Sequence, residues 1–315
     1  MSNQLLENTG NLFGDLWHRY DDELFEESVQ LFTKRFKANN FNLNWFEGKT
    51  CLDAGCGGGR YSIAMARLKT KEVIGIDISE NGLVDARKRG ENFTNVTFQK
   101  ASVLDLPFPD YTFDFICCSG VLHHTSDLEK GLKELSRVLK PQGKCFLLLY
   151  GKGGLRWPTI IKIRPYAQTI GYELMNKTMK LIDMKANKQR TFLDDLFVPL
   201  INFYSWDEVE SILLKNNFTS VSRWEKGRLD HEESVPVQRD EFLLLKKLFA
   251  VILEQKTPEF VAIAPQAKNA LDHIHSTINE LDTAEDDFQS SLINSNQRMQ
   301  KIFGYGHHRL IAEKS

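Results

Sequence analysis

The feature that most constrains the fold is an alternation of short apolar runs with amphipathic helical patterns between residues 50 and 150. The apolar runs predict strands at 49–54, 72–77, 95–100, 113–118 and 143–150. The patterns between them predict helices at 60–69, 80–90 and 127–140, the last ended by Pro141 and Gly143. Strands and helices that alternate in this way build a parallel sheet with helices on both faces. The sequence therefore predicts an α/β fold, a Rossmann-like doubly wound sheet.

The alternation lapses after residue 150 and returns near the end of the chain. Residues 151–204 are irregular to helical, and Ser205 with Glu208 then forms the capping box of a helix over 205–217. The following segments predict a strand at 218–224, helices at 238–256, 264–283 and 285–303, and a last strand at 307–314. We expect the two strands to be the arms of an antiparallel hairpin that completes a seven-stranded sheet, with the helices of 227–306 inserted at its tip.

These elements divide the chain into a core and its additions. The helical insertions are expected to form a cap on the core. The predicted segments are an N-terminal helical lid (1–48), a cofactor-binding core (49–150), a basic insertion or cap (151–204), a core helix and strand (205–226), a helical insertion (227–306) and a final core strand (307–315).

Composition and charge exclude several classes of protein. No apolar run reaches the length of a membrane span, and the first ten residues lack the basic and apolar order of a signal peptide. The five cysteines form no CxxC pair and lie in or beside strand-like runs, as buried residues of a protein in a reducing compartment do. A net charge of −2 argues against a nucleic-acid-binding protein. We therefore expect a cytoplasmic protein, with a homodimer as one possible assembly.

The stretch CLDAGCGGGR, residues 51–60, places an acid before a glycine-rich turn. A dinucleotide fingerprint fails because its third glycine would fall at Arg60, and the Asp53 carboxylate would repel a pyrophosphate. No Lys-Ser/Thr pair follows the glycines, which excludes a P-loop. A ligand with positive charge and no phosphate suits Asp53. S-adenosylmethionine, with its ammonium and sulfonium groups, is such a ligand.

Further residues agree with this ligand. Asp77 ends the second predicted strand, where an acid can accept both ribose hydroxyl hydrogens. The glycines allow close approach of the methionine part, and the N-terminus of the helix at 60–69 offers N–H groups to its carboxylate. The residues we assign to cofactor binding are Asp53, Gly55, Gly57, Arg60, Asp77, Ile78, Ser102, Val103 and Ser119.

Several motifs occur together in one order. They are LDAGCGGGR (52–60), VIGIDIS (73–79), LPFPDYTFDFI (106–116), GVLHHTSD (120–127) and RVLKPQGK (137–144). In this the chain resembles the class I S-adenosylmethionine-dependent methyltransferases, in the branch that includes the ubiquinone and menaquinone biosynthesis enzymes. FGDLWHRYDDELF (13–25) is similar to an N-terminal segment of some members, and SWDEVESILLKNNFTSV (205–221) to the helix and strand after the fifth strand.

One position departs from the family pattern. The resemblance implies an acid that contacts the adenine amino group, and the aligned residue is Ser102. A serine can still hydrogen-bond this group, more weakly, while Val103 would offer its main-chain N–H to the ring. Asp105 could substitute only with a differently wound loop.

Methyl transfer is an in-line displacement that depends mainly on placement and exclusion of water, so a general base is needed only where the acceptor must lose a proton. His123 and His124 follow the fourth strand and are base candidates, with packing as the alternative role. Tyr20, with Trp17, is predicted to belong to a lid over the cofactor or to the packing of an N-terminal helix. The run at 230–233 is interpreted as a charged turn rather than a metal site, so no metal is expected.

The insertion at 151–190 carries the remaining substrate information. It holds nine Lys or Arg against Glu173 and Asp183, and its pattern over 173–186 predicts an amphipathic helix. One interpretation is a cap for an anionic or amphiphilic acceptor, or a membrane-surface contact. The other is a basic face packed on the acidic helices of 227–306.

The function predicted from these features is S-adenosylmethionine-dependent methylation of an oxygen or nitrogen on a small or medium-sized metabolite. A tRNA or protein methyltransferase, which would dock its substrate on the basic segment, remains an alternative. So does an inactive S-adenosylmethionine-binding partner subunit. An NAD-dependent oxidoreductase is disfavoured by Arg60 and Asp53.

Overall fold

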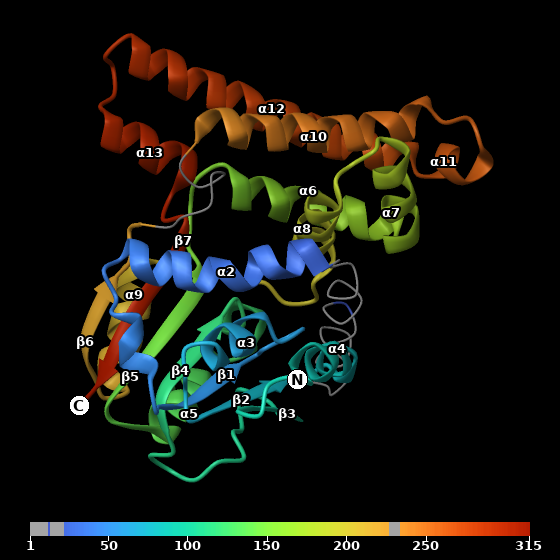
Figure 1. The fold of residues 1–315 in the computed structure, drawn as a ribbon. Coiled ribbons are helices and arrows are strands. Elements are labelled where there is room, and N and C mark those ends of the chain that lie inside the picture. The colour runs from blue at the N-terminus through green and yellow to red at the C-terminus, as the bar shows by residue number, and fades with distance from the viewer. Residues whose placement is uncertain (1–11, 13–21, 227–233) are drawn as a thin grey trace. The chain divides into compact units, whose positions relative to one another are not determined.

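The computed structural model describes residue 12, residues 22–226 and residues 234–315 (Figure 1). The chain divides into two compact units. Unit 1 consists of residues 1–151, 199–228 and 307–315, and unit 2 of residues 152–198 and 229–306. Of the helices formed by the described residues, none has both the length and the apolar character that a membrane span requires.

Unit 1 contains one seven-stranded sheet in the order β3-β2-β1-β4-β5-β7-β6, which confirms the predicted Rossmann-like α/β fold (Figure 1). Neighbours from β3 to β5 pair in parallel, and β7 pairs antiparallel with both β5 and β6. The strands are β1 (Thr50–Ala54), β2 (Glu72–Asp77), β3 (Val96–Lys100), β4 (Phe113–Ser119), β5 (Leu139–Tyr150), β6 (Phe218–Arg223) and β7 (His307–Lys314).

The central parallel strands β1 and β4 are buried on both faces, as strands covered by helices on both sides are. Leu52 belongs to a core with α5 and α9, whereas its neighbour Cys51 belongs to a core with α2, η1 and α3. All five cysteines are buried and free, as predicted. The helices of unit 1 are α2 (Asp22–Ala38), η1 (Leu43–Phe46), α3 (Arg60–Ala66), α4 (Glu80–Gly90), η2 (Leu122–His124), α5 (Leu128–Val138) and α9 (Trp206–Lys215).

The predicted pairing of the last two strands is confirmed. β6 and β7 are antiparallel, with Arg223 opposite Leu310, and β7 continues along β5 as far as the pair Tyr150 and His307. The capping box before α9 is also present: Ser205 Oγ accepts from Glu208 N at 3.3 Å, and Ser205 N donates to the Glu208 carboxylate at 2.6 Å.

Boundaries in unit 1 differ from the prediction at one helix and one strand. The helix predicted at 127–140 ends at Val138, and the strand predicted from residue 143 already begins at Leu139, which pairs with Phe113. Long-range pairing with β4 thus overrides the local helical pattern before Pro141 is reached. Within the N-terminal helical lid predicted at 1–48, the structure describes α2 from Asp22, and residues 1–11 and 13–21 lie outside the described part.

Unit 2 is helical, and α10 and α12 run side by side within it (Figure 1). Its helices are α6 (Arg156–Ile170), α7 (Tyr172–Leu181), α8 (Ala186–Phe197), α10 (Val235–Glu254), α11 (Pro258–Ala262), α12 (Ala264–Gln289) and α13 (Ser295–Phe303).

Three predicted helix limits in unit 2 are wrong. The helix predicted at 173–186 breaks after Leu181, because Asp183 has a φ of 52° that a helix cannot contain. The helix predicted at 264–283 continues to Gln289, and the next one begins only at Ser295 rather than at 285. Asn294 starts that helix by accepting from Gln297 N at 2.9 Å.

Candidate functional site

The predicted cofactor residues follow neighbouring strands at the carboxyl edge of the parallel sheet. Gly55, Gly57 and Arg60 come after β1, Asp77 and Ile78 lie at the end of β2, Ser102 and Val103 follow β3, and Ser119 ends β4. These strands lie next to one another, and the strand order reverses between β1 and β4. Such a switch point is where open α/β sheets bind ligands.

The turn between β1 and α3 requires glycine. Gly55 has a φ of 84°, and a Cβ placed on it would lie 2.3 Å from Val121 Cγ2. The main-chain N–H groups of Gly55 and Cys56 both donate to Ile76 O at 2.8 Å. The turn is therefore bonded to β2 and packed against the segment after β4.

Asp53 is a buried carboxyl, 3% exposed, at the end of β1. Its Oδ2 accepts from Ser62 Oγ at 2.7 Å. Burial raises its pKa to about 6, although the Ser62 hydrogen bond and the charge of Arg60 act in the opposite direction. Within residues 22–226 and 234–315 no cation forms an ion pair with it. A buried carboxylate in this state favours a ligand that brings a positive charge.

Asp77 is held by main-chain donors. Gly57 N donates to its Oδ2 and Ser79 N to its Oδ1, each at 2.8 Å. Burial raises the pKa of this carboxyl, and these hydrogen bonds oppose that rise. Each carboxylate oxygen can accept more than one hydrogen bond, so the group keeps acceptor capacity in a fixed orientation.

The turn after β3 is closed by its own serine. Ser102 Oγ accepts from Leu104 N at 3.2 Å, and Asp105 N donates to Ser102 O at 3.1 Å. Val103 is buried in the core with Leu106, while Ser119 and Ile78 are half-buried.

His123 and His124 form η2 after β4, and both are buried. The His123 ring stacks on Tyr150 with ring centroids 3.7 Å apart, and neither of its nitrogens has a hydrogen-bond partner among the described residues. Burial lowers its pKa well below the usual range, with smaller contributions from His124 and His307, so the ring is neutral. His124 Nδ1 lies 2.8 Å from Leu200 O, and this contact requires the tautomer with a proton on Nδ1.

The end of the predicted basic insertion belongs to unit 1 instead. Residues 199–204, here called the strap, cross the ends of β4 and β5. Asn202 N donates to His123 O at 2.8 Å, and Tyr204 N donates to Tyr150 O at 3.0 Å. His308 Nε2 donates to Tyr204 O at 2.8 Å. The role of the strap follows only from these contacts, whose partners lie roughly 50 to 100 residues away in the sequence.

Other predicted residues fall elsewhere. Tyr20 and Trp17 lie outside the described residues, as does the charged run at 230–233. Over residues 22–226 and 234–315, no group of three or more His, Cys, Asp or Glu side chains could hold a metal ion.

Basic residues of the insertion pair inside unit 2. Arg156 forms ion pairs with both Asp195 and Glu241. The side chains of Arg156, Asp195 and Glu241 are 8%, 2% and 3% exposed, respectively. Lys188 bonds the same Glu241, and Lys177 Nζ lies 2.6 Å from Glu259. For these three cations the structure supports the second of the two interpretations of the basic segment, packing on the helices of 227–306.

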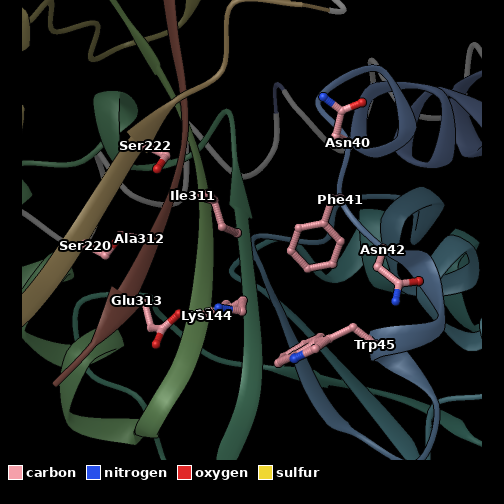
Figure 2. Close-up of a pocket in the computed structure, with 10 residues that line it drawn as sticks. All are labelled: Asn40, Phe41, Asn42, Trp45, Lys144, Ser220, Ser222, Ile311, Ala312 and Glu313. Atoms are coloured by element: carbon pink, nitrogen blue, oxygen red, sulfur yellow. Dashed lines mark hydrogen bonds and ion pairs between the residues drawn. The ribbon is translucent and has the colours of Figure 1, made fainter.

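A separate pocket of about 320 Å³ lies in unit 1 between residues 40–45 and the strands β5, β7 and β6 (Figure 2). Phe41 and Trp45 form one wall, and the ion pair of Lys144 with Glu313 lies on the strand side. None of the predicted site residues lines this pocket.

Comparison with known proteins gives two kinds of match. The sequence model of the methyltransferase domain matches residues 52–147. The 2-phytyl-1,4-naphtoquinone methyltransferase of Nostoc is 40% identical over 106 residues, 32% of this chain and 46% of that protein. The demethylmenaquinone methyltransferase of Staphylococcus carnosus is 30% identical over 178 residues, 56% of this chain and 70% of that protein.

The chain spans about half the length of the first curated relatives that it matches. Among solved structures, a protein from Galdieria sulphuraria described as a candidate sarcosine dimethylglycine methyltransferase aligns over 98% of both chains. Its TM-score is 0.50 and its sequence identity 13%, a likeness in fold alone.

Proposed function

The chain belongs to the class I S-adenosylmethionine-dependent methyltransferases, in the quinone-biosynthesis-like branch, and we propose that it transfers a methyl group from S-adenosylmethionine to a small or medium-sized metabolite. The observation that carries this proposal is the pair of fixed carboxyls, Asp53 and Asp77, at the glycine turn after β1. A cationic nucleoside without phosphate is the ligand that this pair suits.

Each residue at the carboxyl edge of the sheet would bind a different part of S-adenosylmethionine. Asp77 would accept the ribose hydroxyls with the lone pairs that Gly57 and Ser79 leave free. Asp53, whose burial the Ser62 hydrogen bond and the charge of Arg60 offset only in part, would bind the ammonium group. Ser102 accepts a main-chain hydrogen bond, and its hydroxyl proton has no partner among the described residues, so it would serve the adenine side together with Val103.

The cosubstrate supplies the electrophilic methyl group, and the chain supplies placement and exclusion of water. Where the acceptor must lose a proton, His124 is the base candidate whose tautomer is fixed by a hydrogen bond. Its Nδ1–H donates to Leu200 O, which leaves the lone pair on Nε2. His123, neutral and stacked on Tyr150, would shape the acceptor side of the site.

The acceptor that we propose carries an oxygen or nitrogen nucleophile on an anionic or amphiphilic molecule. The internal pairing of Arg156, Lys188 and Lys177 lowers the positive charge available for a tRNA or protein substrate, and so supports a small-molecule acceptor. Incubating the protein with a metabolite extract and S-adenosylmethionine labelled in its methyl group, followed by mass spectrometry, would identify the product. Absence of any labelled product and of S-adenosylhomocysteine release would favour a non-catalytic subunit.

Cofactor binding is tested by Asp77→Ala. We expect it to weaken S-adenosylmethionine binding by ~1.5 to 3 kcal/mol, the free energy that hydrogen bonds to a charged group contribute. Calorimetry measures the affinity, and circular dichroism checks that the variant is folded. Glu80→Ala, which removes an exposed carboxylate three residues away that pairs with Arg87, is the matched control and should leave the affinity unchanged. Unchanged affinity in folded Asp77→Ala would contradict the ribose assignment.

A further inference from the structure

The turn after β4, residues 121–125, contacts the glycine turn directly. Val121 lies so close to Gly55 that a Cβ on the glycine would be 2.3 Å from Val121 Cγ2. The shape of the glycine turn therefore depends on where Val121 is held.

The internal bonds of the 121–125 turn leave carbonyls that need donors. His124 N donates to Val121 O at 2.9 Å, while Thr125 N and Thr125 Oγ1 donate to Leu122 O at 3.1 and 2.7 Å. None of these bonds reaches the carbonyls of His123 and Thr125. Buried carbonyl groups are almost always hydrogen-bonded, so these two must find donors outside the turn.

Asn202 of the strap supplies the donors. Its main-chain N–H donates to His123 O at 2.8 Å. Its side-chain Nδ2 donates to His123 O at 3.2 Å and to Thr125 O at 3.0 Å. One residue thus binds both carbonyls, and it binds them at the end of the turn opposite Val121.

We propose that Asn202 is a positioning residue for the cofactor site, acting through the 121–125 turn and Val121 on the glycine turn at Gly55. This inference rests on the proposed function, since it concerns the same site. Asn202 lies four residues after Val198, the last residue of the unit 2 segment 152–198. The same contact therefore ties the turn after β4 to the point where the chain returns from unit 2.

Two substitutions and a matched control test the positioning role. Asn202→Ala removes both side-chain bonds. Asn202→Asp keeps the size but turns an acceptor oxygen toward two carbonyls. The control is Asn95→Ala, because Asn95 Nδ2 likewise donates to two carbonyls, those of Ala66 and Thr70, at 3.2 and 3.0 Å. Asn95 precedes β3 and so lies at the other edge of the sheet.

Calorimetry with S-adenosylhomocysteine is the first measurement. We expect Asn202→Ala to weaken its binding roughly 5- to 30-fold, and Asn202→Asp by more, with Asn95→Ala near wild type. In a double-mutant cycle with Val121→Ala, the loss from Asn202→Ala should become smaller once Val121 is shortened, because both changes act on one path. Equal losses in Asn202→Ala and Asn95→Ala, or strict additivity with Val121→Ala, would overturn the proposal.

A second measurement does not depend on the ligand. The His123 ring protons, stacked 3.7 Å from the Tyr150 ring, should give a ring-current-shifted NMR signal in protein with labelled histidine. This signal should move toward its unshifted position in Asn202→Ala and stay in Asn95→Ala. A signal unmoved by Asn202→Ala would refute the positioning role. If the wild-type protein bound no S-adenosylhomocysteine, the proposed function would fail while this measurement still tested the contact.

Discussion

Replacing Asp53 by asparagine should stabilise the protein without its ligand, although it removes a residue of the proposed binding site. The side chain is 3% exposed and accepts hydrogen bonds from the hydroxyl and the main chain of Ser62, which an asparagine oxygen can also accept. The substitution therefore changes the charge of the site and little else. Burial raises the pKa of Asp53 from 3.8 to about 6.

The raised pKa fixes the sign and the size of the effect. Between pH 3.8 and about 6 the folded chain holds a proton that the unfolded chain has released, so stability falls as the pH rises. At about 1.4 kcal/mol for each pKa unit, the loss reaches ~3 kcal/mol above pH 6. The asparagine side chain is neutral at every pH. The variant should therefore be more stable than wild type by ~3 kcal/mol at pH 8. At pH 4 the difference should be less than ~1 kcal/mol.

Urea denaturation at a series of pH values measures this difference. Asp114→Asn is the matched control. Burial acts to raise the pKa of Asp114, but hydrogen bonds from Thr50 N and Lys140 lower it below its ordinary value. The control should therefore lose stability relative to wild type as the pH rises. The reasoning fails if Asp53→Asn shows the same stability difference at pH 4 and pH 8. S-adenosylhomocysteine should bind Asp53→Asn more weakly, since the compensating charge is gone.

Two further predictions concern the buried cation of unit 2 and the histidines. Arg156→Met should destabilise unit 2 by ~3 to 5 kcal/mol in urea, because it removes the buried cation that pairs with both Asp195 and Glu241. Lys177→Met, at an exposed pair, should cost under ~1 kcal/mol, and equal losses in the two variants would contradict the importance of burial. His124→Ala should lower turnover ~10²- to 10⁴-fold on an acceptor that loses a proton, with S-adenosylhomocysteine affinity nearly unchanged. His308→Ala is the control for His124→Ala, because it also removes a histidine bonded to a strap carbonyl. If His124→Ala lost S-adenosylhomocysteine affinity together with turnover, the role of His124 would be packing rather than proton removal.

Much of unit 1 could be predicted because its signals are local. β1 is buried on both faces, which requires covering helices, and a parallel neighbour follows from the spacing of the next apolar run. The positions of Asp53 and Asp77 at strand ends place them at one sheet edge once the strands are parallel. The closing pair of β6 and β7 could be predicted from alternation in 307–314, although about 80 residues separate the two strands.

Other features depend on contacts that periodicity does not record. The break after Leu181 is set by the left-handed backbone of Asp183 in a run whose apolar pattern continues through it. Arg156 looks like part of a basic surface in the sequence, yet its partners Asp195 and Glu241 bury it. The strap carries no motif, because its function lies in main-chain bonds and one asparagine amide.

The segments of unit 2 are inserted at one edge of the sheet, and this position makes such large insertions compatible with the fold of unit 1. Tyr150 at the end of β5 lies opposite His307 at the start of β7, and β6 ends beside β7 at the same edge. Parallel strands also present the predicted site residues there. Beyond the sheet the two chain segments stay bonded within unit 2, with Tyr305 N donating to Lys152 O and Leu155 N to Ile302 O, each at 2.9 Å. Insertions at this edge leave the strand pairing of the core unchanged, so the core can keep a general ligand site while the inserted segments diverge.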